Sequence, residues 1–309
     1  MSFCMNYHQN LLGIPIKDAA AHIFRRPYLF VNPTVRMLQI ATFLAIGPQI
    51  YVDGLVVFNE SKKPIGRISS KHIISNILRT GYPDWLEITA EQIMDDFAAT
   101  VDMNSPLSKA LEVFDKTRFA FVPITAKDDS GGRSPEAAEV VASLSIRDIL
   151  PLIAKTNIDR PIKDLCSQLI SVDKNTSIRN AIDFMMKQGI RNIGIKEDVN
   201  NDDDSSSNSN NNTKTKLLRI INDRKILEFL VSHNGRKIMQ TNGVTGLADV
   251  DIINHLNMIS AKKVKYDTTT SGAAELLMDI RNPCLILEED DEKKDNSIVT
   301  PWDIVMKTL

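Results

Sequence analysis

Two short stretches of the sequence combine a hydroxyl and a carboxylate at a spacing that can do chemistry. Thr300 precedes Asp303 by three residues, and Ser145 precedes Asp148 by three, each pair directly after a short apolar run. Such a pair suits a capping box, in which the hydroxyl and the acid accept unpaired backbone N–H groups at a helix start. It also suits a ligand, because a helix N-terminus attracts phosphate and a carboxylate accepts hydrogen bonds from neighbouring sugar hydroxyls. The sequence is compatible with both interpretations.

Two weaker copies of the pattern lack the acid. Ser69 is followed by His72, and Asn222 by Lys225, at the same spacing. Neither replacement accepts ribose hydroxyls as a carboxylate does, although Lys225 can meet a phosphate as a point charge. An imidazole at position 72 can also change its charge near pH 6.5, although a plain helix residue is the simpler interpretation.

The leading residues of the four patterns, Ser69, Ser145, Asn222 and Thr300, are spaced 76, 77 and 78 residues apart. A fixed period of this kind indicates repeated structural units. The local hydrophobic patterns predict the order helix, strand, helix, strand, strand, helix in each unit. We therefore expect an α+β fold of four repeats, each a small three-stranded sheet with helices, at residues 12–80, 84–154, 157–232 and 244–309.

A repeat of this size buries limited surface, and its sheet leaves one face bare. The repeats should therefore pack in pairs, which places two modules at residues 1–156 and 157–309. The Asn- and Ser-rich tract 199–213 cannot bury apolar area and is predicted to be a disordered insert at a hairpin tip. The equivalent tips at 126–138 and 288–296 are also enlarged.

Composition excludes several classes of protein. The 309 residues are 43% hydrophobic and 25% charged, with a formal net charge of −2, which disfavours a nucleic-acid partner. No apolar run approaches the roughly 18 residues of a membrane span, and the N-terminus does not resemble a secretory signal. Three scattered cysteines favour a reducing cytoplasm over a disulfide framework or a metal site. Since no catalytic motif is present, we expect no enzyme activity and no metal.

The repeat pattern resembles the cystathionine-β-synthase (CBS) domain. The resemblance is most specific in the second copy, through Phe121-Val-Pro-Ile124 and Ser145-x-x-Asp148, and in the fourth, through Thr300-x-x-Asp303. Four tandem copies would cover nearly the whole chain, a layout similar to that of AMP-activated protein kinase γ subunits. The family implies paired copies, called Bateman modules, that bind adenosine nucleotides or similar ligands between the copies.

The resemblance also implies roles for particular residues. The Asp would hold ribose and the Ser or Thr would lie near ribose or phosphate, which makes Ser145, Asp148, Thr300 and Asp303 the predicted nucleotide-binding residues. Weaker candidates are Ala99, Arg118, Pro123, Ser69, Arg191 and Arg281, of which the three arginines can reach phosphate. The alternative for each arginine is a solvated surface side chain. Because two signatures lack the acid, we expect at most two good sites, one per module.

Two functions follow as hypotheses. In the first, the chain is a cytoplasmic regulatory protein that requires no cofactor, binds AMP, ADP, ATP or S-adenosylmethionine, and signals to a protein partner. In the second, it is an interaction scaffold with degenerate sites, in which Thr300 and Asp303 only cap a helix. A homodimer is expected from the family resemblance alone.

Overall fold

The computed structural model describes residues 11–46, 53–80, 87–96, 99–126, 139–199, 214–288 and 297–309. The predicted hairpin insert, apart from Val199, and nearly all of the two other enlarged tips lie outside these ranges. We call the four predicted units repeats 1 to 4, and the two predicted pairs modules 1 and 2.

Each repeat contains the predicted small sheet, in which the first strand runs parallel to the second and the second antiparallel to the third. Repeat 1 consists of β1 (Phe30–Val31), α3 (Met37–Ile46), β2 (Gly54–Phe58), β3 (Pro64–Ser69) and α4 (Ser70–Thr80). Repeat 2 consists of β5 (Val101–Asp102), α6 (Leu107–Thr117), β6 (Phe121–Ala126), β7 (Glu139–Ser145), η3 (Ile146–Ile149) and α7 (Leu150–Lys155).

Module 2 has the same order of elements. Repeat 3 consists of β9 (Ser171–Asp173), α8 (Ile178–Gln188), β10 (Asn192–Val199), β11 (Lys214–Asn222) and α9 (Asp223–Val231). Repeat 4 consists of β12 (Lys262–Val264), α12 (Thr270–Met278), β13 (Leu285–Leu287), β14 (Ser297–Val299) and α13 (Pro301–Thr308). The α+β class with small sheets is therefore confirmed.

Two of the sheets have one strand more than predicted. Strand β4 (Asp95–Asp96) pairs antiparallel with β3, and β8 (Ser167–Gln168) pairs antiparallel with β14. The apolar pattern of residues 88–96 predicts one helix, but only α5 (Ala90–Ile93) is helical, because the helix ends at Met94, whose dihedrals φ −63° and ψ 151° are extended. The backbone can therefore turn into the strand that extends the sheet of repeat 1.

Two further helices join repeats 3 and 4. They are α10 (His233–Asn242) and the 3₁₀ helix η5 (Val244–Ala248), and the sequence patterns did not predict either. Ser232 caps α10 by accepting a hydrogen bond from the Gly235 N–H at 3.1 Å, and Met239 is fully buried.

The repeats of each module exchange their leading segments. The segment with α2 (Ile16–Ala19) and η1 (Ala21–Arg25) packs on repeat 2, where the Leu107 N–H donates to the Ile14 carbonyl at 2.8 Å. In return, α5 packs on repeat 1, where the Met37 N–H donates to the Ile88 carbonyl at 2.7 Å. Module 2 does the same with η4 (Ile162–Asp164) on repeat 4 and α11 (Ile252–His255) on repeat 3. Each module is therefore intertwined.

Strands β2 and β13 are buried on both faces of their sheets, and alternate residues of each strand belong to different hydrophobic cores. In β2, Leu55 and Val57 pack with the helices, whereas Val56 and Phe58 pack against Phe121 of the facing sheet in repeat 2. In β13, Leu285 and Leu287 face the helices and Ile286 faces repeat 3. A strand buried on both faces reads as a continuous apolar run, as Gly54–Phe58 does.

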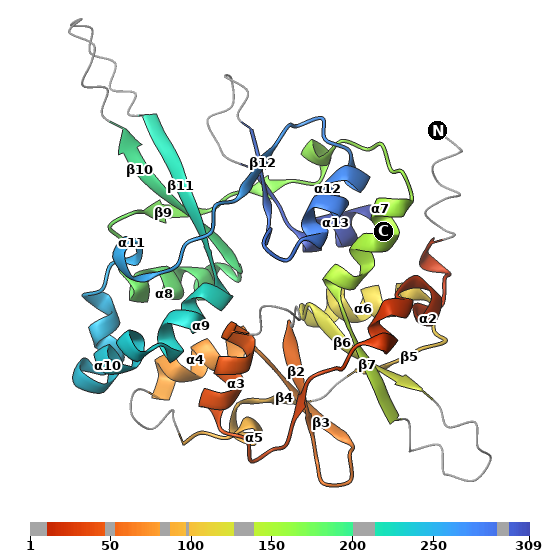
Figure 1. The fold of residues 1–309 in the computed structure, drawn as a ribbon, viewed down its shortest axis with the longest axis horizontal. Coiled ribbons are helices and arrows are strands. Elements are labelled where there is room, and N and C mark those ends of the chain that lie inside the picture. Colours follow the sequence, from red (N-terminus) through yellow and green to blue (C-terminus); the bar gives the residue numbers. More distant parts are fainter. Residues whose placement is uncertain are drawn as a thin grey trace, which may run out of the picture.

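The helices join the two modules. Helices α3 and α4 pack on α9, which unites repeats 1 and 3 in one hydrophobic core, and α7 packs on α12 and α13, which unites repeats 2 and 4 in another. The four repeats thus surround a common centre (Figure 1).

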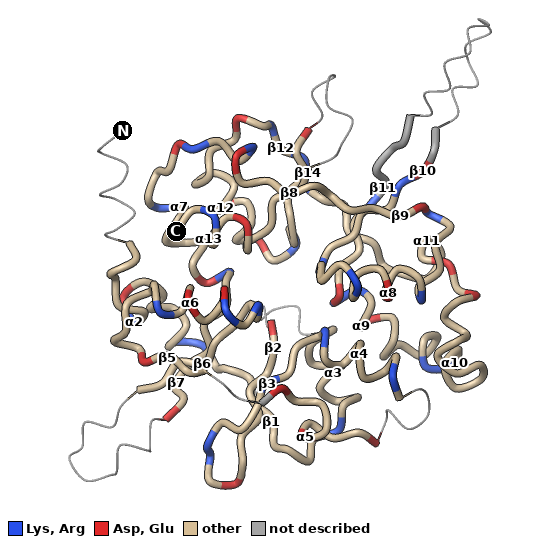
Figure 2. The backbone as a smooth tube through the Cα atoms, turned by 180° about the vertical axis from the view of Figure 1, so that it is seen from behind, with Lys and Arg blue, Asp and Glu red and all other residues tan. Residues whose placement is uncertain are grey.

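Basic and acidic residues are interspersed over all four repeats (Figure 2). No helix in the described part of the chain has the length and apolar character of a membrane span.

The exchanged segment gives a stability prediction. Ile16 of α2 is fully buried in the core shared by repeats 2 and 4, while its neighbour Lys17 is exposed. Ile16→Ala should lower the free energy of unfolding by about 2–5 kcal/mol, as other large-to-small core substitutions do. Urea unfolding followed by circular dichroism measures it, with Lys17→Ala as control. Equal stability of the two variants would contradict the packing of this segment on repeat 2.

Candidate ligand-binding site

The Ser-x-x-Asp and Thr-x-x-Asp pairs both form capping boxes. Asp303 accepts a hydrogen bond from the Thr300 N–H at 3.0 Å, and the Thr300 hydroxyl accepts one from the Asp303 N–H at 3.3 Å. Asp148 accepts from the Ser145 N–H at 2.7 Å, and the Ser145 hydroxyl accepts from the Arg147 N–H at 3.1 Å. The capping interpretation of both pairs is therefore correct, and it leaves the ligand interpretation open.

The two degenerate signatures cap their helices without an acid. In repeat 1, the Ser69 N–H donates to Nδ1 of His72 at 3.2 Å, so the imidazole takes the place of the carboxylate. In repeat 3, the side-chain oxygen of Asn222 accepts from the Lys225 N–H at 2.9 Å, and the Lys225 ammonium pairs with Glu228 at 2.6 Å. Lys225 is not among the described residues that line the cavity below.

A cavity of about 630 Å³ lies where the four junctions meet, and all four repeats contribute to its wall. The residues before the closing helices of repeats 1, 3 and 4, namely Ser69, Asn222 and Thr300, line it, and repeat 2 contributes Ile146 and Arg147. Its volume falls in the range of about 300–1,000 Å³ that is usual for small-molecule sites. The cavity is thus large enough for a nucleotide.

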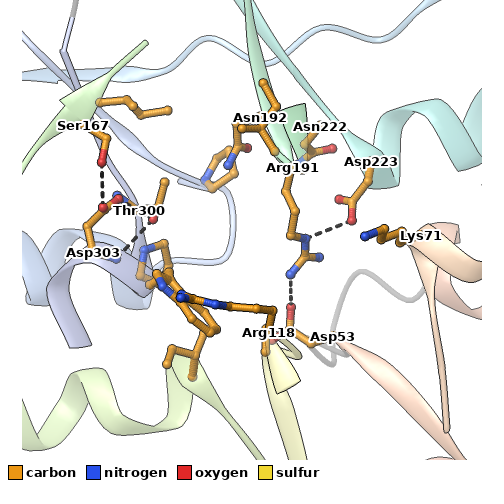
Figure 3. Close-up of a pocket in the computed structure, with 18 of the residues that line it drawn as sticks. Asp53, Lys71, Arg118, Ser167, Arg191, Asn192, Asn222, Asp223, Thr300 and Asp303 are labelled. Atoms are coloured by element: carbon orange, nitrogen blue, oxygen red, sulfur yellow. Dashed lines mark hydrogen bonds and ion pairs between the residues drawn. The ribbon is translucent and has the colours of Figure 1, made fainter. Parts of the chain in front are cut away.

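One end of the cavity belongs to module 2 and carries the intact signature of repeat 4. One carboxylate oxygen of Asp303 accepts from the Ser167 hydroxyl at 2.9 Å (Figure 3). The same oxygen pairs with the Lys307 ammonium at 2.7 Å. The cavity lining also includes apolar side chains from both repeats of this module: Leu169, Ile170, Pro283 and Ile298. An acceptor for hydroxyl groups and apolar side chains therefore line the same cavity.

Basic side chains of module 1 also line the cavity, and they differ in their exposure and in their contacts. Arg147 is 8% exposed and donates to the carbonyls of Leu277 and Asn282, so it is fixed within the fold. Arg118 is 71% exposed at its side chain and lies 5.8 Å from the centre of the Trp302 ring, which belongs to the other module. Lys71, at the start of α4, also lines the cavity.

Arg191 lies between two carboxylates. Its Nε donates to Asp223 at 2.9 Å and its Nη1 donates to Asp53 at 2.7 Å (Figure 3). The second oxygen of Asp53 accepts from the Ser145 hydroxyl at 2.8 Å. Ser145 thus reaches the cavity wall only through Asp53.

The signature of repeat 2 is occupied by the chain itself. Nη2 of Arg26 donates to Asp148 at 2.6 Å, and Nε2 of His22 lies 3.2 Å from the same carboxylate. Arg26 precedes the first apolar run of repeat 1 by two residues, and Ser167 stands at the same place before that of repeat 3. The signature acid of repeat 4 thus accepts from the Ser167 hydroxyl, whereas that of repeat 2 accepts from the Arg26 guanidinium.

Aromatic rings fill the gap between the sheets of module 1. Tyr28, Phe58, Phe119 and Phe121 pack there, and Gly54 is required because a Cβ at that position would lie 2.2 Å from the Phe121 ring. The equivalent cluster of module 2 contains no aromatic ring among its described members, which are Leu169, Ile220, Cys284, Ile286 and Ile298. The described cavity wall includes Thr300 and Asp303 of module 2 but neither Ser145 nor Asp148 of module 1, the module in which these larger side chains pack.

The structure brings some of the predicted residues together and not others. Thr300, Asp303, Ser69, Arg118 and Arg191 line the cavity. The described lining does not include Ser145, Asp148, Pro123, Ala99 or Arg281. Arg281 instead pairs with Asp279 at 2.7 Å at the surface and holds the pKa of that carboxyl at about 2.

The sequence patterns did not identify four of the residues that line the cavity, namely Asp53, Asp223, Ser167 and Trp302. The position of Ser167 could have been found by aligning the leading segments of repeats 1 and 3, since it matches Arg26. Asp53 and Asp223 gave no comparable signal, because an acid before a strand or at a helix start is common. Among the described residues, no three His, Cys, Asp or Glu side chains gather as a metal site requires.

His72 gives the cavity a titratable cap. Burial is the largest influence and lowers the pKa of His72 below its usual value of 6.5, with Arg67 and Lys71 acting in the same direction and Asp95 opposing them. The ring lies 5.3 Å from that of Phe119, centre to centre. A neutral imidazole can accept the Ser69 N–H through Nδ1, whereas a protonated one cannot.

We expect this cap to weaken in acid. The unfolded chain binds the proton near pH 6.5 and the folded chain only at lower pH, so the stability that His72 contributes is complete above pH 6.5 and is lost as the pH falls from 6.5 through the folded-state pKa. Urea unfolding at pH 7.5 and pH 5.5 should therefore show a larger loss of stability for the wild type than for His72→Gln. An equal loss would contradict this role.

Comparisons with known proteins agree with this architecture. Residues 90–155 match the CBS domain family. A Methanocaldococcus jannaschii protein proposed as an archaeal homologue of g-AMPK superposes with a TM-score of 0.74 at 16% sequence identity, over 96% of this chain and 100% of that one. No curated protein matches the sequence.

Shorter solved structures match about half of the chain. A CBS domain pair from Methanocaldococcus jannaschii, in complex with 5′-methylthioadenosine and S-adenosyl-L-methionine, has 20% identity and a TM-score of 0.36 over 46% of this chain and 98% of that one. A CBS-domain protein of Agrobacterium tumefaciens has 17% identity and a TM-score of 0.36 over 45% and 93%. Residues 90–155 are therefore a CBS domain, and the chain as a whole has the fold of tandem CBS repeats.

Proposed function

We propose that this chain is a regulatory protein that binds one adenosine-type ligand, AMP, ADP, ATP or S-adenosylmethionine, in the central cavity and signals its presence to a protein partner. The observation that supports this most is the composition of the cavity. Its wall combines Thr300 and Asp303 with an apolar slot and with basic side chains from the opposite module. These are the three chemical features that recognise a ribose, a base and a phosphate.

The ribose would lie at Asp303. The carboxylate oxygen that now accepts from Ser167 and Lys307 can accept from the two hydroxyls of a ribose once these donors give way. The base would lie in the neighbouring slot formed by Leu169, Ile170 and Ile298. Ser145 and Asp148, which the family resemblance also suggests, are a less suitable place because the described cavity lining includes neither of them.

The phosphate end would face module 1. Arg118, whose guanidinium lies near the Trp302 ring, and Lys71 bring positive charge from module 1 to the cavity wall, and charge-assisted hydrogen bonds from such groups are the strong ones. A ligand held in this way contacts both modules. It would favour one arrangement of the modules over another and so change the affinity of a partner by linkage.

The direct test is titration of the purified chain with AMP, ADP, ATP and S-adenosylmethionine by calorimetry and thermal shift. A ligand at about 100 times its Kd should stabilise the fold by roughly 2.7 kcal/mol. If none of the four binds, the interaction scaffold is the better function, since Asp303 is already satisfied as a cap. The cytoplasmic location and the homodimer remain predictions.

Asp303→Asn should weaken nucleotide binding about 10- to 100-fold, because hydrogen bonds to a charged acceptor contribute about 1.5–3 kcal/mol and a neutral amide accepts fewer hydroxyls. Its matched control is Asp148→Asn, the same substitution in the signature that does not line the cavity, which should keep the wild-type affinity. Calorimetric titration with AMP distinguishes the two. Equal affinities would contradict the place of the ribose.

Replacing Arg118 by glycine should weaken ATP binding without lowering the stability of the fold. It ends α6 in the left-handed conformation, φ 58°, where the equivalent end of α8 has Gly189 with φ 66°. An L-residue other than glycine pays about 1–2 kcal/mol there, so Arg118→Gly should leave stability unchanged or raise it by up to ~1 kcal/mol. The same variant should bind ATP more weakly. Weaker folding with unchanged ATP affinity would show that Arg118 is structural.

A further inference from the structure

Four side chains from three repeats form one polar network at the module boundary. Arg191, at the start of β10, bonds to Asp223 of its own repeat and to Asp53 of repeat 1, and Asp53 bonds to Ser145 of repeat 2 (Figure 3 shows the first two contacts). The distances, 2.9, 2.7 and 2.8 Å, are those of good hydrogen bonds. The network therefore fastens module 2 to both repeats of module 1.

The members of the network differ in their access to the cavity. The side chain of Asp53 is 1% exposed and that of Arg191 is 43% exposed, although both contribute to the cavity wall. A guanidinium binds carboxylate and phosphate with the same fork of donors. An anion that enters the cavity thus meets a reachable arginine whose present partner is a buried acid.

The network is also unbalanced in charge, since two carboxylates share one guanidinium. If Arg191 turns to another anion, Asp53 keeps only the Ser145 hydroxyl among its side-chain partners in the described residues, and a buried carboxylate without a cation is strongly disfavoured. Arg147 offers a contrast on the same wall, because its two terminal nitrogens donate to the carbonyls of Leu277 and Asn282.

We propose that Asp53 is a built-in competitor for the anionic part of the ligand. It holds Arg191 across the module boundary, lowers the affinity of the cavity for phosphate groups, and makes their binding compete with this contact between the modules. This inference rests on the proposed function for the identity of the ligand. Asp53 itself is a positioning residue, since it acts through Arg191.

The proposal has a consequence for ligand discrimination. A neutral nucleoside does not need Arg191, so its binding leaves the network intact. A nucleotide whose phosphate reaches Arg191 opens the network and loosens module 1 from module 2 at this point. The cavity would then distinguish charged from uncharged ligands by their effect on the module contact as well as by affinity.

The test compares AMP, adenosine and inorganic pyrophosphate by calorimetry with the full chain. Asp53→Asn removes the competing charge while keeping the size and an acceptor for Ser145. It should raise the affinity for AMP and pyrophosphate about tenfold and leave that for adenosine unchanged. The matched control, Asp279→Asn, removes an acid from an exposed ion pair that does not line the cavity and should change none of the three.

A second variant has the opposite expected sign. Ser145→Ala deprives Asp53 of its hydroxyl donor, so Asp53 depends more on Arg191, and the affinity for AMP and pyrophosphate should fall. This variant decides the matter if Asp53→Asn does not fold, because the loss of a cap costs only about 1 kcal/mol. A purely structural role for Asp53 would shift the three ligands together or not at all, and that result overturns the proposal.

The outcomes for the two proposals are separable. If the wild type binds AMP but neither variant changes its AMP or pyrophosphate affinity, Asp53 is no competitor and the nucleotide function stands. If pyrophosphate binds and neither AMP nor adenosine does, the nucleotide function falls, and the variants still decide the competition for Arg191. No binding of any probe by wild type and variants overturns both.

Discussion

Each closing helix of this chain starts where a strand ends, and the free backbone N–H groups of its first turn need acceptors. The four repeats solve this in different ways, with an acid in repeats 2 and 4, an imidazole in repeat 1 and an amide in repeat 3. Since these junctions converge, residues at the starts of the helices, and with them the positive ends of the helix dipoles, meet at one cavity. The same constraint that stabilises each helix thus prepares the centre of the molecule for an anion.

The convergence follows from the way in which the sheets are buried. A sheet of three short strands has two apolar faces, and no repeat can cover both with its own helices. One face is covered by helices and the other by the sheet of the partner repeat, and the exchange of leading segments fixes that pairing. Packing of α3 on α9 and of α7 on α12 then joins the modules and encloses the space between them.

The sequence predicted the parts of this fold that depend on local patterns. The period of the signatures identified the repeats, and the apolar runs located the hairpin strands, because both are properties of short stretches. It did not predict β4 and β8, since two-residue strands form only where a neighbouring sheet edge accepts them. It also could not show which repeat each leading segment packs on, because Pro15-Ile-Lys-Asp18 looks the same whether it covers repeat 1 or repeat 2.

The candidate site was likewise predictable only where it depends on local sequence. The signatures identified Thr300 and Asp303, and they identified Ser145 and Asp148 equally well. The difference between these pairs lies in long-range contacts: Arg26 pairs with Asp148 from 122 residues away, and aromatic rings fill the space beside it. An intact signature therefore specifies a helix cap, and contacts from distant parts of the chain decide whether its acid lines the cavity. With Ser167 at that place, the acid of repeat 4 lines the cavity, and one of its oxygens is held by Ser167 and Lys307.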